Sequence, residues 1–282
     1  MGENEEVVNI PLTRRNCGLG NLLYRGINLL YDYANALSID DLKCNLYWNH
    51  YKTDSVVPEH FEDEETSIDV FNYLHERVVT ETKINFNHII NDSKEFVVID
   101  DLKYLYGNKK SFVELYNPHK TKKNKICLWG LDKNFTSTDA SGGELTHNNW
   151  RHQTYDDWIR IREFLSQYYE VIELNYRLPI REVYYHICTS EFTIGYAGAF
   201  HALSVLLRKP NISIVGLNNK LYSDTMKELL KIDTELKRIH TKKIYSYEAL
   251  WYNDTVDDIC NIDNINHYKN IAFDNIEKLK FL

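Results

Sequence analysis

Apolar and polar positions in the second half of the chain form blocks that predict strands and helices in turn. Residues 126–130 and 171–174 are short apolar runs of the kind that form buried strands. A helix is expected over residues 179–187, because a proline suits the first helical position. Residues 155–169 place apolar side chains three and four positions apart, which predicts a helix with one buried face: Trp158, Ile161, Phe164 and Leu165.

Residues 188–216 predict a strand, a turn, a helix and a second strand. The β-branched and aromatic run 191–194 stops at Gly195, and small residues follow. The helix is expected to end at Pro210, because proline lacks an N–H and restricts the residue before it. Residues 211–216 then form another buried strand. The whole order, βαβαβαβ, predicts a doubly wound parallel sheet.

The first half carries a weaker form of the same alternation. Helices are expected over residues 22–37 and 67–79, the second with Ser67 as its N-cap. The apolar runs predict strands at residues 6–11, 44–48 and 95–101.

A basic stretch at residues 117–125, broken by a proline, is expected to link the two halves. A nucleic-acid patch is the alternative interpretation of its lysines. The predicted domains are an acceptor-side α/β domain, 1–118, and a nucleotide-sugar-binding α/β domain, 119–250. The rest of the chain is expected to be helical at residues 224–239, 247–252 and in a tail, 251–282, that packs back on the first domain.

Composition limits the function classes. The chain has 282 residues and a net charge of −8, and 43% of its residues are hydrophobic, which is typical of a globular protein. No apolar run approaches the roughly 18 residues of a membrane span. The amino terminus is acidic, whereas a signal peptide would be basic. Five scattered cysteines without CxxC spacing indicate reduced thiols, so we expect a cytoplasmic protein without a zinc site.

The turn after residue 194 suits phosphate. Gly195-Tyr196-Ala197-Gly198-Ala199 is built from small residues and precedes a helix, whose first amide N–H groups have no partner within the helix. These groups and the helix dipole attract anions. The alternative interpretation is an ordinary βαβ unit whose glycines serve only tight packing.

These residues also carry a resemblance. Gly195, Gly198, His201, Ala202, Pro210 and Gly216 resemble the donor-site segment of GT-B glycosyltransferases, the heptosyltransferase-like members most of all. The string that starts Gly18-Leu19-Gly20-Asn21 is similar to the opening loop of fucosyltransferase-like GT-B enzymes.

The resemblance implies two Rossmann-like doubly wound domains that face a cleft. It implies transfer of a sugar from a nucleotide-diphosphate sugar to the hydroxyl of a glycan, or of a hydroxymethylated base in phage DNA. The reaction would be inverting and metal-independent, and the nucleotide sugar would be a co-substrate with no further cofactor. A GT-B-like sugar-nucleotide epimerase and a non-catalytic nucleotide-binding α/β protein are the alternatives.

Candidate site residues follow from what sugar transfer requires. Lys133 and Arg151 could bind the diphosphate, and a carboxylate, Glu191 or Glu173, could bind the ribose. The donor segment adds Gly195, Ala197, Gly198, Ala199 and His201, although His201 could instead be a core histidine. The first-half loop offers contacts to acceptor or phosphate: Arg14, Arg15, Gly18, Gly20 and Asn21. An inverting reaction needs a base, for which position favours Asp100, followed by Asp101, Asp54 and His50.

Overall fold

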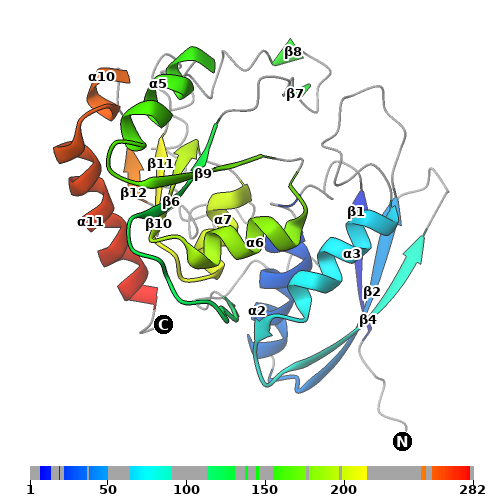
Figure 1. Cartoon of the computed structure of the whole chain (residues 1–282). Helices are drawn as coiled ribbons and strands as arrows, with labels where there is room; N and C mark the ends of the chain where they lie inside the picture. Colours follow the sequence, from blue (N-terminus) through cyan, green and yellow to red (C-terminus); the bar gives the residue numbers. More distant parts are fainter. Residues whose placement is uncertain are drawn as a thin grey trace, which may run out of the picture. The chain divides into compact units, whose positions relative to one another are not determined.

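Parallel sheets form the core of both halves of the chain, as the computed structural model shows (Figure 1). The chain divides into two units, Met1–Tyr116 (unit 1) and Asn117–Leu282 (unit 2), whereas the sequence placed the boundary at residue 118. The predicted mixed α/β class with parallel sheets is confirmed. The structure describes residues 7–13, 19, 22–36, 38–49, 64–90, 113–130, 137–138, 144–145, 155–175, 178–196, 199–214, 249–251 and 256–279.

Unit 1 contains a three-stranded parallel sheet in the order β1-β2-β4. Because successive parallel strands are joined by right-handed crossovers in the same direction, the intervening helices lie on one face (Figure 1). The elements are β1 (Val7–Thr13), the π-helical turn η2 (Leu22–Asn28), α2 (Leu29–Ala36), β2 (Asp41–Asn49), α3 (Glu64–His75) and β4 (Lys83–Ile90). The short strands β3 (Val78–Val79) and β5 (Glu114–Leu115) pair antiparallel beside it.

The two faces of this sheet differ in polarity. On the helix side, β2 buries Leu42, Cys44, Leu46 and Trp48. On the other side, Asn9, Asn45 and Asn87 lie in register on the three strands. Their side chains form a ladder, in which the Asn45 amide donates to the Asn9 oxygen at 2.8 Å and the Asn87 amide to the Asn45 oxygen at 3.1 Å. These hydrogen bonds tie the strands together across their polar face.

The structure of the first half differs from the sequence prediction at β4 and at the start of α3. Strand β4 was not predicted, although residues 83–90 form the third strand of the sheet. The prediction of Ser67 as an N-cap is wrong, because α3 begins at Glu64 and Ser67 lies buried within it. The predicted strand 95–101 lies outside the described residues.

Unit 2 contains a five-stranded parallel sheet in the order β12-β11-β10-β6-β9. The predicted alternation of strands and helices from residue 125 to 214 is confirmed. The elements are β6 (Lys125–Trp129), α5 (Tyr155–Leu165), β9 (Glu170–Leu174), α6 (Ile180–Thr189), β10 (Phe192–Tyr196), α7 (Ala199–Leu206), β11 (Asn211–Ile214) and β12 (Ala249–Trp251). Strands β7 (Ser137–Thr138) and β8 (Glu144–Leu145) form a separate antiparallel pair.

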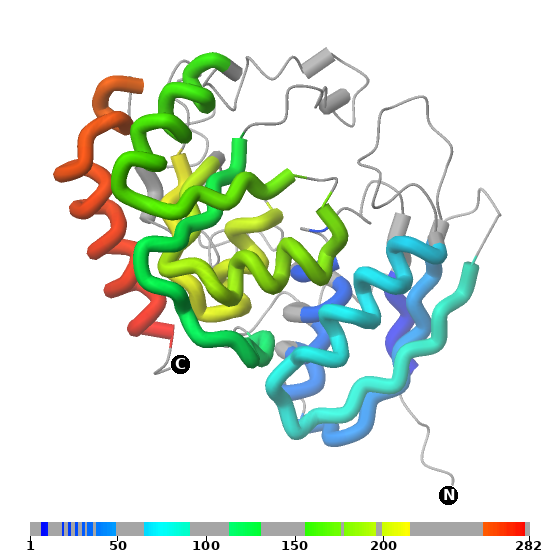
Figure 2. The backbone as a smooth tube through the Cα atoms, viewed as in Figure 1, coloured from blue at the N-terminus to red at the C-terminus, as the bar shows by residue number. Residues whose placement is uncertain are grey.

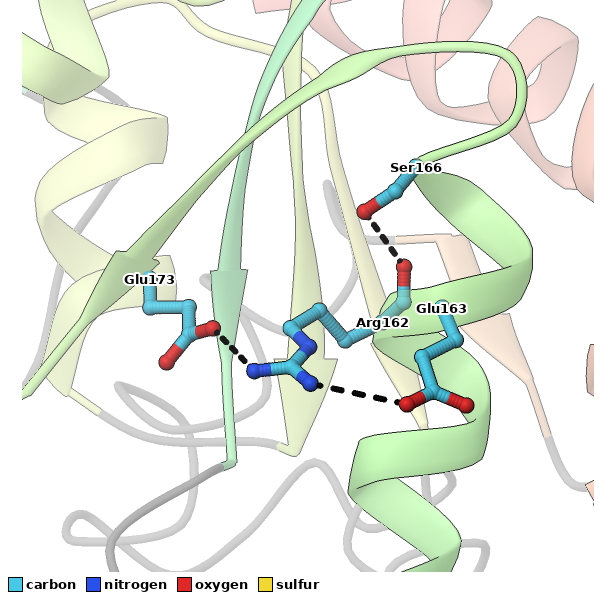
Figure 3. Close-up of polar contacts among 4 residues, drawn as sticks. All are labelled: Arg162, Glu163, Ser166 and Glu173. Atoms are coloured by element: carbon cyan, nitrogen blue, oxygen red, sulfur yellow. Dashed lines mark hydrogen bonds and ion pairs between the residues drawn. The ribbon is translucent and has the colours of Figure 1, made fainter.

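Helices cover both faces of the unit 2 sheet, with α6 and α7 on one face and α5 and α11 on the other (Figure 1). Helix α5 buries Trp158, Ile161 and Leu165 as its spacing predicted. Its polar side is fixed to β9, because Arg162 donates to Glu173 at 3.0 Å and lies 3.7 Å from Glu163 (Figure 3).

The carboxy-terminal part of the chain packs within unit 2. Helices α10 (Val256–Ile259) and α11 (Ile262–Leu279) follow β12, and α11 lies against β11 and β12. The expectation that the tail packs back on the first domain stays a prediction. The predicted helix at residues 247–252 is wrong, because residues 249–251 form a strand paired with β11. The predicted helix at 224–239 lies outside the described residues.

Candidate functional site

The strand order of unit 2 reverses between β6 and β10. The chain leaves β6 toward β9 on one side, whereas β10, β11 and β12 extend on the other. Ligands of open α/β sheets bind beyond the carboxyl ends of the strands at such a reversal, because the flanking crossovers diverge there and leave a crevice. The turn from β10 into α7 begins at this point. The fold therefore brings Gly195 and the N-terminus of α7 to the end of β6.

Gly195 allows β6 and β10 to approach closely at this point. It pairs in register with Trp129, the last residue of β6. A Cβ atom on Gly195 would lie 2.2 Å from the carbonyl oxygen of Trp129 and 2.7 Å from its Cβ. Gly130, which follows, has a φ of 155°, and a Cβ there would meet the Trp158 ring. Both glycines are thus needed for the backbone geometry of the reversal point.

Helix α7 is buried along nearly its whole length. Every residue from Phe200 to Leu206 is buried. The sheet face beneath it is small and polar, because Thr193 pairs with Asn211 and Gly195 pairs with Ser213 in register. The Thr193 and Ser204 hydroxyl oxygens are 3.1 Å apart, and the Ser204 hydroxyl donates to the Phe200 carbonyl at 2.8 Å. These contacts hold the helix axis, and therefore its N-terminus, in place.

His201 lies inside this interface. Its ring is 0% exposed, and its Nδ1 is 2.5 Å from the Ser213 hydroxyl oxygen. Burial lowers the pKa of the His201 imidazole to about 3, so the ring is neutral at pH 7. Its Nε2 has no hydrogen-bond partner within the part of the chain that the structure describes. The geometry makes His201 a residue that positions α7 against β11.

Sequence reasoning missed Ser213 as the partner of His201. The signal was present in the run Asn211-Ile212-Ser213-Ile214, where polar and apolar residues alternate with the period of a strand. A buried strand with one polar face requires polar groups in the element that covers it.

Glu191 lies at the amino end of β10, whereas the turn into α7 lies at its carboxyl end. It precedes β10, so the four residue steps to Gly195 place it about 13 Å from the turn into α7. Its carboxylate is 2.6 Å from Lys269 of α11 and accepts the Asn124 N–H at 2.8 Å. Burial alone would raise the pKa of Glu191, but these two hydrogen bonds lower it below its ordinary value. The structure does not bring Glu191 together with Gly195, Ala199 and the N-terminus of α7.

Glu173, the alternative carboxylate for the ribose, is paired with Arg162 (Figure 3). The other predicted site residues lie outside the described residues. They are the donor candidates Lys133, Arg151, Ala197 and Gly198, the first-half loop residues Arg14, Arg15, Gly18, Gly20 and Asn21, and the candidate bases Asp54, Asp100, Asp101 and His50.

No group of three or more His, Cys, Asp or Glu side chains in the described part of the chain could hold a metal ion. None of the helices described is both long and apolar enough to cross a lipid bilayer. In comparisons with known proteins, the chain matches no protein-family model, no curated protein and no solved structure.

Proposed function

We propose that the protein is a GT-B-type glycosyltransferase that moves a sugar from a nucleotide-diphosphate sugar to an acceptor hydroxyl. One observation supports this most strongly. The segment that resembles a GT-B donor site starts at the strand-order reversal of unit 2, where open α/β sheets bind their ligands. The proposal places the donor diphosphate over the N-terminus of α7.

The first amides of α7 suit a leaving diphosphate. The N–H groups of its first turn have no partners within the helix, and the helix dipole adds partial positive charge there. Such fixed donors stabilise the charge that develops on a leaving phosphate without reorganisation. In the proposal, Lys133 and Arg151, in the segment that follows β6, add cationic contacts to the same phosphates.

The remaining parts of the proposal concern unit 1. Its parallel sheet would form the second of two Rossmann-like domains, and the acceptor would bind beside it. Asp100 would take the proton of the acceptor hydroxyl as the general base of an inverting reaction. The acceptor would be a glycan or a hydroxymethylated base of phage DNA.

A charge placed at Ala199 tests the donor site. Ala199 is the first residue of α7 and is partly exposed. In Ala199→Glu, the new carboxylate would repel a diphosphate, yet a negative charge in the first turn favours the helix itself. Ala199→Gln has nearly the same size without the charge and serves as the control.

The measurement is the thermal shift of the whole chain with UDP-, GDP- and ADP-sugars, with CMP-sugars as a monophosphate comparison. We expect one diphosphate sugar to raise the melting temperature of the wild type and Ala199→Gln but not of Ala199→Glu. The unliganded melting temperatures should agree closely. Equal shifts in all three proteins, or no shift with any nucleotide sugar, would contradict the proposed site. Donor turnover that never yields a product on an acceptor would instead favour an epimerase.

A further inference from the structure

Residues 117–125, expected to form a linker, are an ordered segment fixed to unit 2, which we call the strap. Figure 2 follows it past the C-terminal end of α6 and into β6. The backbone N–H of Lys122 donates to the Thr189 carbonyl at 2.8 Å, and that of Asn124 to the Glu191 carboxylate at 2.8 Å. The Asn117 amide donates to the Cys188 carbonyl at 3.4 Å. The strap therefore caps the end of α6.

Two buried lysines strengthen this attachment. Lys209, 5% exposed, donates to the Thr121 hydroxyl at 2.6 Å and to the Ser190 carbonyl at 3.0 Å. Lys125, 2% exposed, donates to the Thr189 hydroxyl at 2.6 Å. Desolvation by burial lowers the pKa of both ammonium groups, so each is costly to bury. The strap is thus held to unit 2 by contacts with the end of α6, with Glu191 and with Lys209, which precedes β11.

The outer side of the strap is strongly basic. Residues 117–125 contain one histidine, no acidic residue and four lysines, three of which are exposed while Lys125 is buried, in a chain whose net charge is −8. His119, Lys120, Lys122 and Lys123 are all exposed. A rigid backbone that presents several cations in a row binds a polyanion with little ordering cost.

An aromatic side chain lies beside these cations. Tyr185 on α6 is 40% exposed, and its ring is 5.0 Å from that of His119 in an edge-on arrangement. The Lys125 ammonium is 5.2 Å from the centre of the same ring. The His119 and Lys125 contacts fix the orientation of Tyr185 while part of the ring remains open to solvent.

We propose that the strap and Tyr185 form a binding surface for single-stranded nucleic acid. The lysines contact successive phosphates, and an unpaired base stacks on the Tyr185 ring, the combination by which proteins hold single strands without reading sequence. The surface lies at the amino ends of the sheet strands, whereas the proposed donor site lies at their carboxyl ends. The two proposals can therefore be tested independently of each other.

The test is fluorescence anisotropy of the full chain with a labelled oligothymidylate of about 20 nucleotides. We expect binding whose affinity falls as salt rises, with a log–log slope of about −2 if three phosphates are contacted. Lys120→Glu/Lys122→Glu should weaken binding by at least about tenfold and flatten the slope. The control, Lys83→Glu/Lys278→Glu, makes the same change in net charge at exposed lysines outside the strap and should have little effect.

Substitutions at Tyr185 distinguish a single strand, whose bases can stack on an aromatic ring, from anions that are bound by charge alone. Tyr185→Leu should weaken binding roughly tenfold, whereas Tyr185→Phe, which keeps a stacking ring, should not. The proposal is overturned by an absence of binding at low salt or by equal losses in both charge-reversed proteins. It is also overturned if Tyr185→Leu binds like the wild type, or if duplex DNA or anionic lipid vesicles bind more tightly than the single strand.

Discussion

The burial of His201 predicts a specific loss of stability in acid. The perturbation is a change from about pH 7.5 to about pH 5 in the wild type and in His201→Asn. In the unfolded chain the imidazole has a pKa near its ordinary value of 6.5, whereas burial lowers the pKa in the folded protein to about 3. The unfolded state therefore binds a proton that the folded state excludes between these two values.

The size of the effect follows from this difference in proton binding. Above about pH 7.5 both states are neutral at this residue, and the wild type keeps its full stability. As the pH falls below about 6.5, each pH unit removes about 1.4 kcal/mol from the free energy of unfolding, so about 2 kcal/mol is lost by about pH 5. The ring is 0% exposed, so solvent screening does not reduce this value.

The assay is equilibrium unfolding in urea at several pH values. His201→Asn is expected to be less stable at neutral pH, because a smaller side chain leaves a cavity, but its stability should fall less steeply in acid. The other titrating groups cancel in the comparison of slopes. Ser213→Ala is the matched control, since it removes the partner but keeps the buried ring and should keep the steep slope. Equal slopes in the wild type and His201→Asn would refute the reasoning, because the ring would then have to take up a proton in the folded state.

Two further predictions concern the packing of unit 2. Gly195→Ala should lower the free energy of unfolding by about 1–3 kcal/mol, because the added methyl meets the Trp129 backbone at 2.2 Å; a change below about 0.5 kcal/mol in urea unfolding would contradict the close approach of β6 and β10. Lys269→Met should cost about 1–3 kcal/mol at neutral pH, because it leaves the mostly buried Glu191 carboxylate with the Asn124 N–H alone. The double variant Glu191→Gln/Lys269→Met should recover part of this loss, and a double variant no more stable than Lys269→Met would show that the charge is not the cause.

The second half of the fold was predictable because the apolar runs of its strands and the residues that end its helices indicate the same element boundaries. Strand β6 is buried throughout, and after Lys125 its sequence is a continuous apolar run, whereas Pro210 marks the end of a helix. Strand β4 was missed although Ile84, Asn85, Phe86 and Asn87 alternate between apolar and polar, which is the period of a strand with one buried face. The structure explains these residues, since Asn87 belongs to the ladder on the polar face of the sheet.

The site was predictable only in part, because its position depends on strand order. Local pattern placed a small-residue turn before α7, but the reversal between β6 and β10 is a property of the whole sheet. The order of residues already places Glu191 at the start of the strand that leads to Gly195, but its partners Lys269 and Asn124 are distant in the sequence and could not be predicted from local pattern. Likewise, α7 is apolar around most of its circumference, so its spacing could not reveal that His201 faces Ser213.

Hydrogen–deuterium exchange tests the central claim most directly. The first backbone amides of α7, residues 199–201, lack partners within the helix, so a bound diphosphate should slow their exchange. The account predicts that a saturating nucleotide-diphosphate sugar protects the peptide that contains these residues and leaves the strap, residues 117–125, unchanged. Bound donor with unchanged exchange at residues 199–201 would contradict it.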